Sequence, residues 1–228
     1  MSPRRFRFAP SPTRLLHIGN ALAALIGWAE ARRCGGRFVL RIEDIDTTRC
    51  KQEFEEACLR DLKWLGIQWD EGPDIGGPHA PYRQSERLSD YDAALDSLIE
   101  RGLAYSCTCS RADIRAAQRA PHLHHKGESP YPGTCRELRG RQRVAGRGGF
   151  RLALSTRAEE GVYAWRDKWM GEQKEDVRTT CGDFLLGRHG APTYQLAVCV
   201  DDAAMGISDV VRGRDLLGST ARQALLHR

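Results

Sequence analysis

The sequence contains no long hydrophobic run. Across its 228 residues, no stretch approaches the ~18 consecutive apolar residues that a membrane-spanning helix needs. Its first residues, Met1-Ser2-Pro3-Arg4-Arg5, lack the apolar centre of a secretory signal. We therefore expect a cytoplasmic protein that has no membrane partner.

A strong excess of one charge is also lacking. The net charge is +5, although the basic residues are overwhelmingly arginine. Such a balance allows contact with a polyanion without requiring it. Hydrophobic residues make up 41% and charged residues 29% of the chain, which is typical of a globular protein. The length suffices for one large domain, or for a domain with a small insertion.

Aliphatic residues are scarce over 106–149, a segment rich in Arg, His, Gly and Pro. Such a segment cannot build much of a core and needs another means of stabilisation. Without an export signal its cysteines are expected to be thiols or metal ligands, and Cys107, Cys109 and Cys135 supply three ligands of a tetrahedral zinc site. For the fourth ligand, chemistry alone favours a histidine over Tyr131, because tyrosine must lose a proton. The candidate histidines are His122, His124 and His125.

What the sequence does have is a strand, a proline-rich turn and a helix start in succession from Arg7 to Asn20. The residues read R-F-A-P-S-P-T-R-L-L-H-I-G-N. At the helix start, free backbone N–H groups and the helix dipole favour an anion, and His17 stands where it can contact a phosphate. Gly19 leaves space for a flat ring against the backbone. An ordinary connection with an incidental histidine is the alternative.

Helical spacing follows this stretch, and Gly35-Gly36 ends the predicted helix. A mostly apolar strand over 37–42 completes a β-α-β unit, which predicts a parallel sheet with ligands at the carboxyl ends of its strands. The apolar positions expected to face the core recur at Leu22, Leu25, Ile26 and Ala29.

Three carboxylates come directly after that strand, in the run Glu43-Asp44-Ile45-Asp46. Such a cluster can be a metal site, a solvated loop, or a group of side chains that bind an amine and hydroxyls. Its place at the carboxyl end of the second strand favours a role in binding substrate.

The remaining elements are predicted more coarsely. Helices are expected over 51–66, from Leu88 onward, and from Pro192, which suits a first helical turn. Strands are expected over 150–154, 184–190 and 205–211, and a final helix follows 212–217. Residues 155–182 are polar, with Trp165 and Trp169 as expected packing anchors.

These motifs resemble those of one known family, the glutamyl-type class I aminoacyl-tRNA synthetases. The stretch from Phe8 to Gly19 is similar to their F-A-P-S-P-T-G-x-L-H-I-G signature, and R-I-E-D-I-D from Arg41 is similar to a second run. Arg14 stands where the family has glycine, so the turn needs another backbone conformation or a solvent-directed side chain. Two further family positions are matched by Tyr194, before L-A-V-C-V-D-D, and by Arg212, in V-V-R-G-R-D-L.

The resemblance implies an α/β fold: a Rossmann-type catalytic domain in which helices cover both faces of a parallel sheet. Residues 1–105 and 150–228 would form its two halves. Residues 106–149 would form a small zinc-binding insertion between them.

The short glutamyl-queuosine tRNA(Asp) synthetases of this family are more similar still, through a Cys-x-Cys…Tyr-x-x-x-Cys pattern and the ending L-G-S-T-A-R-Q. The resemblance implies a ligase that uses ATP to convert glutamate to glutamyl-adenylate and passes the glutamyl group to queuosine in the anticodon of tRNA(Asp). The expected partners are L-glutamate, ATP and this tRNA, and the expected state is a monomer. The implied ligands of one structural zinc ion are Cys107, Cys109, Tyr131 and Cys135.

The resemblance also implies roles for the site residues. Arg7 and Arg212 suit the two carboxylates of glutamate. Glu43 suits its ammonium group, and Tyr194 and Ser11 supply hydrogen bonds. His17 and Gly19 are the catalytic candidates, because His17 would stabilise charge developing on the phosphate, and magnesium is expected to accompany ATP. The residues expected to bind glutamate or its adenylate are Arg7, Phe8, Ala9, Pro10, Ser11, Glu43, Tyr194 and Arg212.

A second signature of class I synthetases, the lysine-containing KMSKS loop, is missing from the sequence through Arg228. Without its mobile cation over the phosphates, glutamate would bind but would be activated poorly. Two alternatives follow from the same residues. One is the catalytic fragment of a glutamyl-tRNA synthetase, and the other is a non-catalytic relic that binds glutamate or tRNA.

Overall fold

The computed structural model describes residues 3–110, 112–114, 131, 133–136, 148–154 and 161–228. The chain forms two compact units. The first unit comprises Met1–Leu88 and Val200–Leu217, and the second comprises Ser89–Cys199 and Gly218–Arg228.

The first unit is built on a parallel sheet. Its strands are β1 (Arg5–Phe8), β2 (Arg37–Leu40) and β9 (Asp209–Val210), in the order β2-β1-β9. Helix α1 (Ile18–Arg33) connects β1 to β2 and ends before Gly35, whose φ of 65° suits glycine. The predicted β-α-β unit and its parallel sheet are thereby confirmed.

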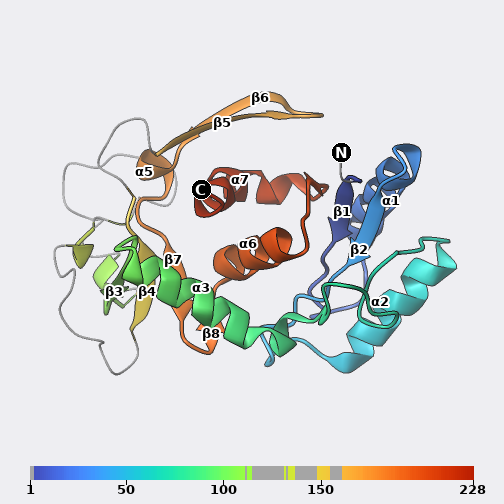
Figure 1. The fold of residues 1–228 in the computed structure, drawn as a ribbon, viewed down its shortest axis with the longest axis horizontal. Helices are drawn as coiled ribbons and strands as arrows, with labels where there is room; N and C mark the ends of the chain where they lie inside the picture. Colours follow the sequence, from blue (N-terminus) through green and yellow to red (C-terminus); the bar gives the residue numbers. More distant parts are fainter. Residues whose placement is uncertain (1–2, 111, 115–130, 132, 137–147, 155–160) are drawn as a thin grey trace. The chain divides into compact units, whose positions relative to one another are not determined.

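Helices pack against this sheet (Figure 1). On one face, the side chains of β1 and β2 join α1 and α2 (Gln52–Trp64) in a core that includes Phe6, Phe38 and Leu62. On the other face, Val39 packs with Met205, the residue that follows α6 (Tyr194–Ala204). This alternation follows from the period of two along a strand.

The predicted core face of α1 is wrong. Leu22 is 54% and Leu25 is 42% exposed, and the residues buried against the sheet are Ala24, Gly27 and Ala31. The helix therefore contacts the sheet through small side chains.

The second unit contains an antiparallel sheet in the order β3-β4-β7-β8. Its strands are β3 (Ala104–Cys107), β4 (Gly149–Leu152), β7 (Leu185–Arg188) and β8 (Ala191–Pro192). A separate hairpin pairs β5 (Val162–Asp167) with β6 (Gly171–Asp176). The helical segments of the remaining chain are η1 (Gln84–Glu86), α3 (Leu88–Glu100), α5 (Val177–Thr180), η3 (Arg214–Ser219) and α7 (Thr220–Leu226). In the part of the chain that the structure describes, no helix has both the length and the apolarity to cross a bilayer.

Two predicted boundaries and one predicted packing residue need correction. Pro192 belongs to β8, where it pairs with Gly187, so α6 begins only at Tyr194. The expected strand over 205–211 is reduced to β9, because Gly206, with a φ of 62°, turns the chain after α6. Trp169 is 70% exposed at the turn of the β5–β6 hairpin and is no packing anchor.

Candidate functional site

The segments after β1 and β2 run side by side at the carboxyl edge of the parallel sheet. The backbone N–H of Arg41 donates to the carbonyl of Phe8 at 3.0 Å, and that of Glu43 donates to the carbonyl of Pro10 at 2.9 Å. Phe8 and Pro10 are buried, Ala9 is half-buried and Ser11 is exposed. The stretch from Arg7 to Asn20 and the acidic run from Glu43 therefore meet at one edge of the sheet.

A buried network of charges connects these segments to α6. Arg7 contacts Asp202 through Nε and Nη2 at 3.2 and 3.4 Å. Arg41, which has no exposed surface, lies 2.8 Å from Asp202, 3.2 Å from Glu43 and 3.4 Å from Asp201. Sequence reasoning assigned no role to Arg41, Asp201 or Asp202.

Burial and pairing set the charges of this network. Burial raises the pKa of the Asp202 carboxyl, but Arg7 and Arg41 outweigh it and hold that pKa below its usual value. For Glu43, burial prevails over Arg41 and Arg7, so its pKa is raised. Burial lowers the pKa of Arg41, yet the surrounding carboxylates keep it above its usual value. Glu43 is therefore more easily protonated than Asp202.

Arg7 uses two of its nitrogens on Asp202, which fixes the plane of its guanidinium. Nη1 and the second N–H of Nη2 are the donors through which it can bind a further carboxylate. Arg212 lies two residues beyond β9 in the same unit and is half-buried. Tyr194 is the first residue of α6, is also half-buried and belongs to the second unit.

Two other carboxylates of the acidic run have different surroundings. Asp44 accepts hydrogen bonds from the backbone N–H and hydroxyl of Ser85 at 2.8 and 2.6 Å. It lines a cavity of about 460 Å³ together with Arg83 and Glu55. Asp46 binds Thr48 and Arg49 on the surface. Within the run, Glu43 is thus the member that enters the buried network.

His17 is the N-cap of α1. Its Nδ1 accepts a hydrogen bond from the backbone N–H of Gly19 at 3.1 Å, and both residues are exposed. A Cβ atom on Gly19 would lie 3.1 and 3.2 Å from two atoms of the His17 ring. The ring of His17 thus lies against Gly19. Arg14 is exposed in the preceding bend, so its side chain is directed to solvent.

We expect Gly19→Ala to impair catalysis without unfolding the protein. The new methyl group must push the His17 ring away, which weakens a cap worth about 1 kcal/mol. Alanine regains about 0.5–1 kcal/mol through its higher helix propensity. Thermal unfolding should therefore change little, while catalytic activity falls. Gly218→Ala, where no atom lies within 4 Å of the new methyl group, is the control; equal activity of the two variants contradicts the role of the ring.

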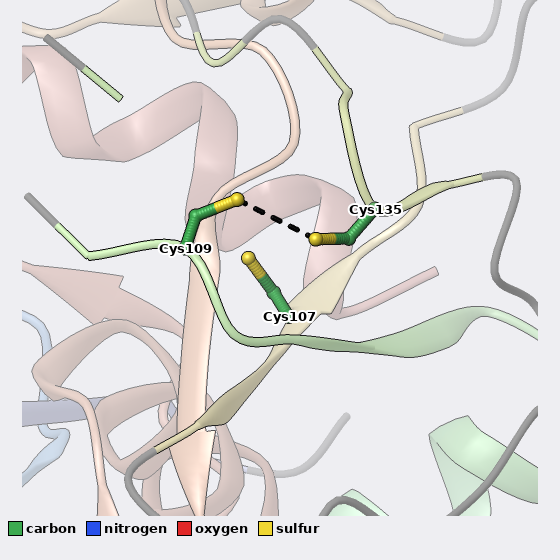
Figure 2. A group of neighbouring side chains, drawn as sticks. All are labelled: Cys107, Cys109 and Cys135. Carbon is green, nitrogen blue, oxygen red and sulfur yellow. Dashed lines mark hydrogen bonds between the residues drawn. The ribbon is translucent and has the colours of Figure 1, made fainter. Parts of the chain in front are cut away.

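Three thiols converge in the second unit. Cys107 ends β3, Cys109 follows it, and Cys135 comes from a separate segment. Their sulfur atoms all lie within 4.8 Å of one another, and Figure 2 shows the side chains pointing toward one another. Tyr131, held by a hydrogen bond from its backbone N–H to the carbonyl of Cys181, places its hydroxyl 3.4 Å from the Cys107 sulfur and 3.5 Å from the Cys109 sulfur.

These four atoms fit a tetrahedral metal ion. Sulfur ligands at about 2.3 Å and oxygen ligands at about 2.0 Å from zinc lie about 3.5–3.8 Å from one another. The sulfur–sulfur distance of Cys109 and Cys135 is 3.4 Å, and the tyrosine–sulfur distances are similar. His122, His124 and His125, the alternative fourth ligands, lie outside the described residues.

Burial and hydrogen bonds shift the pKa values of three of these groups. Burial raises the pKa of the Cys135 thiol, but a backbone hydrogen bond from Thr108 and contacts with its neighbours lower it to about 7. Burial is the main cause that raises the pKa of Cys109 to about 11, and it raises that of Tyr131 as well. The tyrosine hydroxyl therefore needs a bound cation to act as an anionic ligand.

Comparison with known proteins decides the family. Residues 4–228 match the family model of tRNA synthetases class I (E and Q), catalytic domain. The chain belongs to this family. This class I synthetase catalytic domain is accordingly of the ligase type, and the predictions of family and enzyme class are confirmed.

Its relatives include proteins named glutamyl-Q tRNA(Asp) synthetase and proteins named glutamate–tRNA ligase. It is 48% identical to a glutamyl-Q tRNA(Asp) synthetase of Nitratidesulfovibrio vulgaris, an alignment that covers 98% of this chain and 69% of the relative. It is 45% identical to a glutamate–tRNA ligase of Heliobacterium modesticaldum, over 98% of this chain and 45% of that protein. A crystal structure of a glutamate tRNA ligase from Elizabethkingia meningosepticum in complex with its amino acid is similar with a TM-score of 0.85, at 32% identity, over 99% of this chain and 47% of that one. The chain thus spans about half the length of these glutamate–tRNA ligases.

Proposed function

We propose that this synthetase domain activates glutamate with ATP and transfers the glutamyl group to queuosine in the anticodon of tRNA(Asp). The observation that carries the glutamate step is the buried network at the carboxyl edge of the sheet. It holds a guanidinium, Arg7, and a carboxylate, Glu43, in fixed places beside the segment from Phe8 to Ser11. A cation and an anion so arranged complement an amino acid that carries both charges.

In this proposal each of the three charged groups of glutamate is bound by a side chain of opposite charge. Arg7 and Arg212 bind the two carboxylates, and Glu43 binds the ammonium group. Tyr194 and Ser11 supply neutral hydrogen bonds. Because Glu43 has a raised pKa, an ammonium group of the substrate would restore its ionised form.

ATP is proposed to bind along the segment after β1 and at the start of α1. An oxygen of the glutamate α-carboxylate attacks the α-phosphorus, the bond to pyrophosphate breaks, and glutamyl-adenylate forms. His17, kept in place by Gly19, stabilises the charge that develops on the phosphate. Magnesium would accompany the ATP phosphates. The remaining contribution of the protein is the positioning of the reactants.

The second step is proposed to take place on tRNA. A hydroxyl of the acceptor attacks the carbonyl carbon of the adenylate, AMP leaves, and a proton passes from the hydroxyl to a base. The similarity to two proteins named glutamyl-Q tRNA(Asp) synthetase, at 48% and 49% identity, supports queuosine as the acceptor. The similarity to glutamate–tRNA ligases over nearly the whole chain supports a second candidate, charging of tRNA(Glu).

The metal site is proposed to be structural. Cys107, Cys109, Tyr131 and Cys135 would hold one zinc ion and stabilise residues 106–149 as an insertion between the halves formed by 1–105 and 150–228. With all four positions taken by protein ligands, the ion would have no open position for catalysis.

Transfer of labelled glutamate tests the proposed function. We expect ATP-dependent transfer onto tRNA(Asp) that contains queuosine and none onto tRNA(Asp) that lacks it. Transfer onto tRNA(Glu) instead would establish the second candidate. Glutamate binding without exchange of pyrophosphate into ATP, in a protein that includes any continuation of the chain, would identify a non-catalytic relic.

A further inference from the structure

Arg151 lies against the thiol cluster. It stands opposite Tyr105 in the pairing of β4 with β3, and Cys107 lies two residues farther along β3 on the same face. Its Nε therefore reaches the Cys107 sulfur at 3.2 Å, and its guanidinium carbon lies 4.0 Å from the centre of the Tyr131 ring. One cation thus contacts two of the four proposed ligands.

The charge of Arg151 needs a partner. The side chain is 9% exposed, and its Nη1 donates to the backbone carbonyl of Asp183 at 3.0 Å. The carboxylate of Asp183 is occupied by Tyr105 at 2.6 Å and Arg136 at 2.8 Å. Among the residues that the structure describes, none places a carboxylate within ion-pair distance of Arg151. A buried guanidinium without a counter-ion is strongly destabilising, and among the described residues the sulfur cluster is the group in contact with Arg151 that can become an anion.

The proposed metal site has a charge of the right sign. Three thiolates and one phenolate carry four negative charges, and a divalent ion offsets two of them. The excess is costly in a buried site. A guanidinium donating to a thiolate forms a charge-assisted hydrogen bond and offsets one of the two remaining charges.

We propose that Arg151 is a positioning residue and the counter-cation of the metal site formed by Cys107, Cys109, Tyr131 and Cys135. This inference rests on the proposed metal site. It assigns to Arg151 a task that pairing of the strands alone does not require, namely to orient the Cys107 sulfur toward the ion.

The test compares three variants of the full chain by titration of Zn²⁺ against a competing chelator. Arg151→Gln removes the charge, and Arg151→Lys keeps it. Arg222→Gln is the matched control, because Arg222 also points a nitrogen at a sulfur, that of Cys181 at 3.8 Å, outside the cluster. Loss of a side chain that supports a metal ligand weakens affinity about 10–100-fold, which we expect for Arg151→Gln. Arg151→Lys should retain most of the affinity, and Arg222→Gln all of it.

Cobalt substitution separates this role from a merely structural one. Loss of the hydrogen bond raises the energy of the Cys107 lone pairs, so the sulfur-to-Co²⁺ charge-transfer band should move to lower energy in Arg151→Gln. A structural role would lower the unfolding midpoint equally with and without Zn²⁺ and leave the band in place. Should Arg151→Gln not fold, Arg151→Met provides a second neutral side chain, and a band intermediate in energy is expected for Arg151→Lys.

The outcomes distinguish the inference from the site on which it rests. Unchanged Zn²⁺ affinity and an unchanged band in the neutral variants overturn the role of Arg151 while the metal site stands. Absence of Zn²⁺ binding by the unaltered protein, or full binding by Cys135→Ser, rejects the metal site and the inference with it.

Discussion

Replacing Arg41 with glutamine will lower the free energy of unfolding by about 3–5 kcal/mol, the cost of removing one partner from a buried ion pair. Arg41 has no exposed surface and faces Glu43, Asp201 and Asp202. Without it, these carboxylates lie close together with less positive charge between them. Denaturation by urea, followed by fluorescence and circular dichroism, measures the loss. Arg33→Gln, which breaks an exposed pair with Glu30 on α1, should change stability little, because solvent screens such a pair.

The pH dependence identifies the cause. In the unaltered protein the pKa of Asp202 is lowered, so its stabilising effect is present above the unfolded pKa and is lost as pH falls through the folded pKa. In Arg41→Gln the carboxyl pKa values rise above their unfolded values, so stability increases as pH falls from 7 toward 5. The two proteins should therefore converge in acid. A constant difference across this range would point to lost packing instead of uncompensated charge.

Arg41 also shows why part of the site escaped prediction. The motifs that contain Arg7 and Glu43 are local in sequence and each follows a strand, so their shared sheet edge could be inferred. Asp202 stands 195 positions from Arg7, in a helix whose apolar spacing reveals nothing about its polar end. Two adjacent aspartates in the V-D-D run after L-A-V-C did mark this end of the helix as charged. Which arginine each aspartate pairs with could be learned only from the fold.

The fold was predictable where periodicity and turn residues agree, as in β1, α1 and β2. The fold was less predictable where close packing selects small side chains. The ring of Phe38 lies so close to α1 that a Cβ on Gly27 would be 3.2 Å from it. Small residues therefore face the sheet, while a pattern search favours large ones such as Leu22. The β5–β6 hairpin escaped because its strands alternate between exposed and half-buried residues, without the apolar face that predicts a strand.

Replacing Glu43 with glutamine will weaken glutamate binding by about 2–5 kcal/mol, which is about thirtyfold to several thousandfold. The amide keeps the shape of the side chain but removes the charge proposed to face the substrate ammonium group. Stability should change little, because Arg41 retains Asp201 and Asp202, and burial already disfavours the charged form of Glu43. Titration calorimetry with glutamate measures the change. Asp46→Asn, on the exposed side of the same run, is the control.

Two further measurements make this prediction specific to the ammonium group. Because the pKa of Glu43 is raised, the affinity of the unaltered protein for glutamate should fall as pH drops through that pKa, and Glu43→Gln should lack this dependence. Glutarate, which has both carboxylates but no ammonium group, should bind Glu43→Gln at least as well as the unaltered protein, since it leaves no buried charge unpaired. Equal losses for glutamate and glutarate would place the ammonium group elsewhere, and affinities within twofold of the unaltered protein would remove Glu43 from the pocket.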